Sequence, residues 1–138
     1  MPIASKRRQR VRASFDYAVI RIVPRVEREE FINAGVIVLC LEKRYLAAKT
    51  MLDEERLKAL WPQADLGAIR LHLEAVEKIA AGDESAGPLG KMELKARFHW
   101  LTSPRSTILQ TGPVRTGVCE GTEDLVESLL RQLVIANP

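Results

Sequence analysis

Hydrophobic and polar positions in the first third of the chain predict three β-strands. Residues 14–23 are rich in β-branched and aromatic side chains that alternate between two faces, as in a strand. Residues 34–41 form a nearly unbroken apolar run, which is typical of a central strand covered on both faces. A charged connection of residues 25–33, with room for one helical turn, joins these two strands. Residues 45–51 follow a short polar turn, so they are expected to return as the antiparallel partner of a hairpin.

Helical spacing of apolar residues replaces this alternation in the middle of the chain. Asp53 is expected to cap a short helix, and Asp65 to cap a longer one over residues 66–81 that stops at Gly82. The buried stripe of the longer helix steps by three or four positions through Leu66, Ile69, Leu73, Val76 and Ala80. His72 lies among these leucines without a second metal ligand one turn away, and we interpret it as a packing residue.

The last third of the chain combines short strands with a final helix. Residues 106–110 and 114–119 are strand pieces on either side of Gly112-Pro113, which predicts a hairpin or a single kinked strand. Thr122 is expected to cap the final helix. The buried face of that helix is set by Leu125, Leu129, Leu133 and Val134.

The order of these elements favours an α+β fold. Residues 82–90 are interpreted as a flexible loop, and residues 92–100 as a short helix or irregular structure. Strands joined by short returns, with helices grouped between them, predict a small antiparallel sheet with helices packed on one face. Residues 13–138 are expected to form this single domain, preceded by a basic, disordered arm at residues 1–12.

Charge is divided unevenly between the arm and the domain. Of the 138 residues, 21 are Lys or Arg and 18 are Asp or Glu, which gives a net charge of +3. Five of the cations lie in the arm, which holds no acid: Lys6, Arg7, Arg8, Arg10 and Arg12. The rest of the chain therefore carries 16 cations against 18 acids, a net charge of −2. The arm is either a solubilising tail or a contact for nucleic acid or a partner protein, and the domain is not uniformly basic.

Cysteine usage and hydropathy favour a cytoplasmic protein. Cys40 and Cys119 lie in apolar strand-like runs without a CxxC motif, and buried free thiols fit a reducing compartment. The N-terminus lacks the apolar core of a signal peptide. The longest apolar run, residues 34–41, is far shorter than the roughly 20 residues that span a bilayer, so we expect no membrane contact.

A basic, hydroxyl-rich segment at residues 97–119 is the strongest candidate for chemistry. It contains three arginines, one histidine, four threonines and two serines but no acid. Guanidinium groups and hydroxyls are donors that phosphate and carboxylate accept. The candidate ligand-binding residues are Arg21, from the first strand, with Arg97, Arg105, Arg115 and Thr107. The alternative is that these arginines pair with Glu27, Glu29, Glu30 or Glu93.

Motifs for other kinds of site are absent from the sequence. The two cysteines and two histidines do not have the spacing of a zinc site. Phosphate-binding glycine loops and the G-x-S-x-G nucleophile elbow are also missing. No metal or cofactor is therefore expected. His99 is a weak candidate for acid–base catalysis, with Ser106 as a conceivable nucleophile nearby in the sequence.

Two segments, residues 17–39 and 98–119, carry a family resemblance. Their motifs are Arg21 with Pro24, residues 30–36, Trp100-Leu101, residues 104–107 and residues 113–119. With these motifs the chain, roughly from residue 15 to residue 134, resembles the bacterial family catalogued as domain of unknown function 3037. The name implies no activity. The resemblance implies a small stand-alone protein, often encoded beside a kinase similar to the HipA toxin, and thus a partner rather than a reaction.

These features favour three functions. The first is a non-catalytic accessory or binding module with an arginine-rich anion-binding surface, with a HipA-like kinase as the partner that the resemblance implies. The second is a small enzyme that acts on a phosphorylated or nucleotide substrate, with His99 as acid–base. The third is a DNA-binding accessory protein that uses the basic arm. The sequence specifies neither the ligand nor the oligomeric state.

Overall fold

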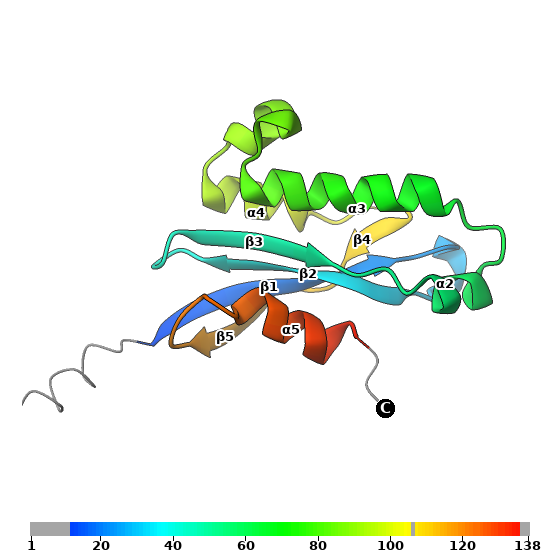
Figure 1. The fold of residues 1–138 in the computed structure, drawn as a ribbon, viewed down its shortest axis with the longest axis horizontal. Helices are drawn as coiled ribbons and strands as arrows, with labels where there is room; N and C mark the ends of the chain where they lie inside the picture. Colours follow the sequence, from blue (N-terminus) through cyan, green and yellow to red (C-terminus); the bar gives the residue numbers. More distant parts are fainter. Residues whose placement is uncertain (1–11, 106, 136–138) are drawn as a thin grey trace, which may run out of the picture.

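An antiparallel sheet forms the centre of the computed structural model, which describes residues 12–105 and 107–135 (Figure 1). Its strands are β1 (Ala13–Ile22), β2 (Ile32–Cys40), β3 (Tyr45–Thr50), β4 (Leu109–Thr111) and β5 (Arg115–Cys119). They lie in the order β3-β2-β1-β4, and β5 also pairs with β1. The three strands predicted from the first third of the chain, including the β2–β3 hairpin, are confirmed.

The strands β4 and β5 share one edge of β1 instead of pairing with each other. β4 pairs with the end of β1, and β5 pairs with its beginning. Between them, the N–H of Gly112 donates to the carbonyl of Val19 at 2.8 Å. Pro113 follows and has no N–H with which to continue the ladder. The two pieces are therefore one kinked edge strand, and the hairpin alternative was wrong.

The rest of the chain contains α-helices and 3₁₀ turns. They are η1 (Val26–Arg28), α2 (Glu54–Leu60), α3 (Leu66–Ala81), η2 (Glu84–Lys91), α4 (Leu94–Leu101) and α5 (Leu125–Leu133). Asp53 and Asp65 cap α2 and α3 as predicted, because each carboxylate accepts a backbone N–H from the first helical turn at 3.1 Å. Gly82 ends α3 in the left-handed conformation, with a φ of 71°.

Two predictions for the connections were wrong. The segment 82–90, interpreted as a flexible loop, holds most of η2, whose first turn is capped by the carboxylate of Asp83. The final helix begins after Asp124 and not directly after Thr122. Thr122 contributes only its backbone carbonyl, which accepts the N–H of Leu125 at 3.3 Å.

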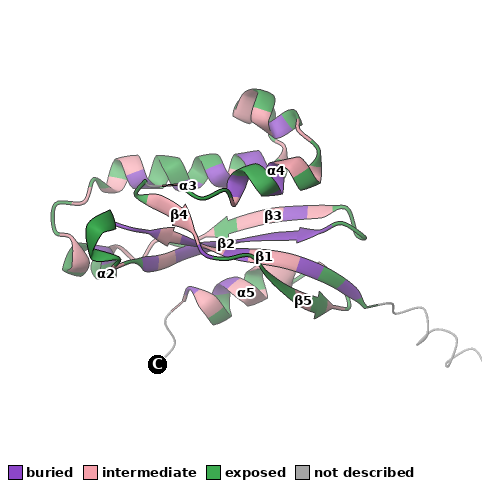
Figure 2. Cartoon of the chain, turned by 180° about the vertical axis from the view of Figure 1, so that it is seen from behind, coloured by how far each residue is buried: buried purple, intermediate pink, exposed green. Residues whose placement is uncertain are grey.

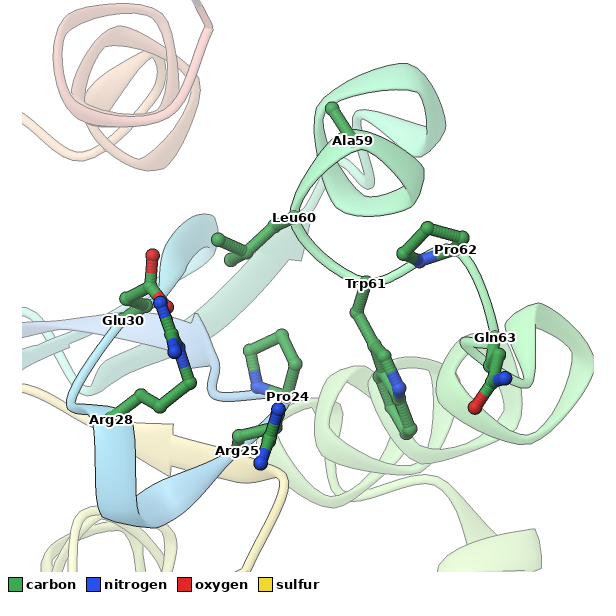
Figure 3. A pocket seen from close by; sticks show the side chains of 9 residues that line it. All are labelled: Pro24, Arg25, Arg28, Glu30, Ala59, Leu60, Trp61, Pro62 and Gln63. Atoms are coloured by element: carbon green, nitrogen blue, oxygen red, sulfur yellow. The ribbon is translucent and has the colours of Figure 1, made fainter.

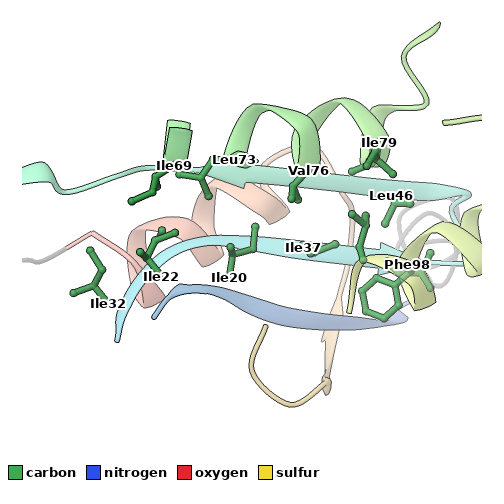
Figure 4. Packing of buried hydrophobic residues seen from close by; sticks show 14 of the residues in the cluster. Ile20, Ile22, Ile32, Ile37, Leu46, Ile69, Leu73, Val76, Ile79 and Phe98 are labelled. Carbon is green, nitrogen blue, oxygen red and sulfur yellow. The ribbon is translucent and has the colours of Figure 1, made fainter. Parts of the chain in front are cut away.

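The first face of the sheet is covered by α3 and α4 (Figure 1). Ile69, Leu73 and Val76 of α3 point down onto the sheet, where they meet side chains such as Ile20 and Ile37 (Figure 4). This layer forms the larger hydrophobic core. The stripe predicted for α3 is therefore its buried face.

The second face is covered by α5, so the prediction that all helices pack on one face was wrong. From residue 34 to residue 40, β2 is buried throughout (Figure 2). Val36 and Val38 point to this second face, where Leu130 and Val134 pack over them. A strand that is apolar on both faces needs cover on both, and α5 supplies it. The α+β class, with an antiparallel sheet in a single domain, is confirmed.

The two cysteines are free thiols on the α5 face of the sheet. Cys40 is buried and Cys119 is partly buried. Burial, followed by the neighbouring Cys40 thiol, raises the pKa of Cys119. Their strands, β2 and β5, lie on opposite sides of β1.

Gly82→Ala is expected to destabilise the fold by about 2 kcal/mol, whereas Gly67→Ala is expected to stabilise it by about 0.5 kcal/mol. A Cβ at Gly82 would be strained by the positive φ and would lie 2.4 Å from Nη1 of Arg97. A Cβ at Gly67, in the first turn of α3, would meet nothing closer than 3.7 Å. Urea unfolding measures both variants. A Gly82→Ala protein as stable as the parent would contradict the close packing of Arg97 against this glycine.

Candidate ligand-binding site

The four candidate arginines do not converge on one cleft. Arg21 and Arg115 lie on the α5 face of the sheet, because the residues directly opposite them in the register pack toward α5. Arg97 belongs to α4 and Arg105 follows it, on the other face. Of the candidate ligand-binding residues, Arg105 and Thr107 line a common cavity.

Arg97 is buried at the end of α3. Only 9% of the residue is exposed, and its Nη1 donates to the carbonyl of Gly90 at 2.9 Å. The guanidinium also packs against Gly82, the residue that ends α3. A helix carries partial negative charge at its carboxyl end, so this position stabilises a buried cation without a carboxylate. Arg97 therefore joins α3, η2 and α4.

Arg105 makes a similar contact at the end of α4. Its Nη2 donates to the carbonyl of Trp100, in the last turn of the helix, at 2.6 Å. Its Cζ lies 4.2 Å from the centroid of the Trp100 ring, a cation–π geometry. Arg105 is only partly buried, so a guanidinium with five N–H donors keeps some of them available to a ligand.

Arg21 is held by an aromatic ring and by backbone. Its Cζ lies 4.2 Å from the centroid of the Phe31 ring. The guanidinium also packs against Gly112, where an added Cβ would lie 2.9 Å from Nη2. Its Nε is buried without a hydrogen-bond partner among the residues that the structure describes. Arg115 is exposed on β5.

Three of the candidate arginines, Arg21, Arg97 and Arg105, contact uncharged groups and not the glutamates that were the alternative partners. Glu27 and Glu30 instead form ion pairs with Arg25 and Arg28. Within residues 12–105 and 107–135, no carboxylate pairs with any of the four candidate arginines. Instead, Arg97 and Arg105 donate to backbone carbonyls, and Arg21 and Arg105 lie over aromatic rings.

A cavity of about 600 Å³ lies between the first turns of α3, the end of β1 and the residues that follow α4. Both tryptophans of the chain, Trp61 and Trp100, line it, and we call it the tryptophan cavity. The other apolar lining residues are Ile22, Val26, Ala68, Ile69, Ile108 and Leu109. Small-molecule sites have volumes of about 300–1,000 Å³, so the cavity is of suitable size.

Polar groups in the tryptophan cavity are few, and some already have partners. The Asp65 carboxylate accepts the N–H of Ala68 as the cap of α3. The Thr107 hydroxyl donates to the carbonyl of Leu109 at 2.8 Å. Arg105 is therefore the charged donor that remains for a ligand.

His72 also lines the tryptophan cavity, and its interpretation as a packing residue was wrong. The side chain is exposed, because it lies beside the buried stripe of α3 and not on it. Sequence reasoning also missed Trp61 and Trp100 as parts of a site. The available signal was that a chain poor in aromatic residues holds only two tryptophans, both next to helix ends.

The remaining candidates lie elsewhere. His99 is exposed on α4 and does not line the tryptophan cavity. Ser106, proposed as its nucleophile partner, lies outside the described residues. Of the basic arm, Arg12 is exposed just before β1, whereas Lys6, Arg7, Arg8 and Arg10 lie outside the described residues.

The described residues contain neither a metal-binding cluster nor a membrane-spanning helix. Nowhere in this part of the chain do three or more His, Cys, Asp or Glu side chains gather in a group that could hold a metal ion. None of its helices combines the length and the apolar character needed to cross a membrane.

Comparison with known proteins gives a family match. The family model described as "Protein of unknown function (DUF3037)" matches residues 17–134 of the 138-residue chain. The match includes both faces of the sheet and every residue that lines the tryptophan cavity. No curated protein and no solved structure matches the chain.

Arg97→Met is expected to lower the free energy of unfolding by about 2 kcal/mol, because it removes a charge-assisted hydrogen bond and a favourable charge at the end of α3. Arg115→Met, on the exposed part of β5, is the control and should change stability by less than about 0.5 kcal/mol. Urea unfolding compares the two variants. Equal stability of Arg97→Met and the parent would mean that the cost of burying the guanidinium cancels its hydrogen bond.

Proposed function

The chain belongs to the DUF3037 family, and we propose that it is a non-catalytic binding module whose tryptophan cavity holds a hydrophobic anion. The observation that supports this most directly is the position of Arg105. Its guanidinium lies against Trp100 at the wall of a largely apolar cavity and retains unused donors. A ligand for this site therefore needs an apolar body and one acceptor group with negative charge.

The two parts of such a ligand have separate energetic roles. The apolar body gains about 25 cal/mol for each Å² that it buries against the tryptophans and the aliphatic walls. A carboxylate matches the planar fork of a guanidinium with two parallel hydrogen bonds. Stacking on Trp100 already restricts Arg105, so less side-chain entropy is lost on binding.

The polar groups of the cavity favour binding over catalysis. Covalent catalysis needs a nucleophile hydrogen-bonded to a base. The hydroxyl of Thr107 donates to a backbone carbonyl instead of to His72, and Asp65 acts as a helix cap. No nucleophile–base pair is therefore present among the described lining residues.

Other parts of the predicted function rest on the sequence alone. The enzyme alternative with His99, DNA contact through the arm and a cytoplasmic location stay predictions. A HipA-like kinase as partner stays an implication of the family resemblance. The tryptophan cavity is compatible with a partner protein as well, because Val26, Trp100 and Ile108 are exposed around it.

The protein is expected to bind 1-naphthylacetate more tightly than the neutral 1-naphthylacetamide, since only the carboxylate pairs with the guanidinium of Arg105. Arg105→Ala should weaken binding of the carboxylate about tenfold or more, because a charge-assisted pair is lost. The amide should bind the parent and the variant about equally. Isothermal titration calorimetry measures all four affinities.

Arg115→Ala is the matched control, because this arginine is exposed on β5 and does not line the cavity. It should bind the carboxylate as the parent does. The assignment of the anion to Arg105 would be refuted if Arg105→Ala bound the carboxylate as tightly as the parent does. It would also be refuted if Arg115→Ala weakened carboxylate binding as much as Arg105→Ala.

A further inference from the structure

A second pair of arginines is aligned by the 3₁₀ turn η1. The N–H of Arg28 donates to the carbonyl of Arg25 at 3.0 Å, which closes this turn. Arg25 precedes the turn in an extended conformation and Arg28 is its last residue, so this bond brings the two residues close together. Both arginines consequently line one hollow of about 730 Å³, distinct from the tryptophan cavity (Figure 3). We call this hollow the arginine groove.

Two glutamates hold these arginines through one edge of each guanidinium. Nε of Arg25 binds Oε1 of Glu27 at 3.0 Å, and Nε of Arg28 binds Oε1 of Glu30. Within the described part of the chain, the Nη groups of both arginines have no hydrogen-bond partner. The glutamates therefore restrict both side chains and leave the outer edges of both guanidinium groups available.

An aromatic wall lies across the groove from the arginines. Figure 3 shows Arg25, Arg28 and Pro24 on one side and Trp61 on the other, where α2 gives way to α3. Trp61 also lines the tryptophan cavity, so its side chain forms a wall common to both hollows. Indole faces stack flat rings, and such stacking needs no particular hydrogen-bond pattern.

We propose that the arginine groove binds a phosphate monoester that carries a flat ring. The phosphate bears close to two negative charges at neutral pH and offers three acceptor oxygens, which suits two guanidinium groups better than a carboxylate does. The ring lies against Trp61. A nucleoside monophosphate and an aryl phosphate share this chemistry. The site uses Arg25 and Arg28 and is independent of the function proposed for Arg105.

Glu30 also lines the groove, so its effect on an anion must be considered. Its carboxylate is held on the Nε edge of Arg28, away from the edge that carries both Nη groups. The ion pairs of both arginines are exposed, and exposed pairs contribute little to stability. A dianion can consequently engage the free edges without a large loss of existing interactions.

The test uses a Trp100→Phe protein, in which Trp61 is the one remaining tryptophan. Because Trp61 lines both hollows, its fluorescence detects binding and the arginine variants show which hollow is occupied. Adenosine 5′-monophosphate or phenyl phosphate is expected to quench Trp61 fluorescence. The ester that binds with the higher affinity identifies the kind of ring that the groove prefers. Adenosine and inorganic phosphate should each bind at least tenfold more weakly, because each lacks one half of the recognised chemistry.

Arginine variants in the Trp100→Phe protein assign the phosphate. Arg25→Ala and Arg28→Ala should each weaken binding about tenfold or more, whereas Arg105→Ala should leave it unchanged. Both changes are at exposed positions, and melting temperatures confirm that the variants fold. The proposal would be overturned if neither ester bound. It would also be overturned if Arg105→Ala abolished binding while Arg25→Ala and Arg28→Ala did not.

Discussion

The two-sided burial of β2 is the constraint on which the rest of the structure depends. Its residues from position 34 to position 40 are all buried, so the sheet must be covered on both faces. The larger cover consists of α3 and α4, and the smaller is α5. Because α3 and α4 have to lie across the same face, the chain needs the tight turn at Gly82 and η2 between them. The guanidinium of Arg97 fills this junction and donates to Gly90.

Both hollows follow from the way this cover begins at one end of the sheet. The end of β1, η1 and the first turns of α3 meet there, with Trp61 between α2 and α3. On one side of Trp61 the walls are mostly apolar and include Arg105, and on the other side Arg25 and Arg28 line the groove. A large side chain at a junction of elements thus separates an apolar hollow from a polar one. The two hollows share Trp61 but no cation, since Arg105 lines one and Arg25 and Arg28 line the other.

Local patterns in the sequence predict the elements well but say little about where they pack. The strand β2 and the helix caps Asp53 and Asp65 depend only on residues a few positions apart in the sequence, and the structure confirms all three. The amphipathic pattern of α5 requires one buried face but does not specify which face of the sheet receives it. The tryptophan cavity combines residues from β1, η1, α3 and the segment after α4, so no local pattern contains it. His72 illustrates the same limit, because its exposure depends on what α3 packs against.

The arginines show why local charge balance is a poor guide to available donors. Residues 97–119 hold no acid, which made their arginines the natural candidates for an anion. Arg97 and Arg105 instead donate to helix carbonyls, which are strong acceptors that a sequence does not mark as charged. Arg25 and Arg28 lie among glutamates and were not suspected, yet each glutamate binds an Nε atom and leaves the Nη groups without partners among the described residues. An acid beside an arginine can therefore orient the guanidinium for a ligand, whereas an arginine without a neighbouring acid can be held by a backbone carbonyl, as Arg97 is by Gly90.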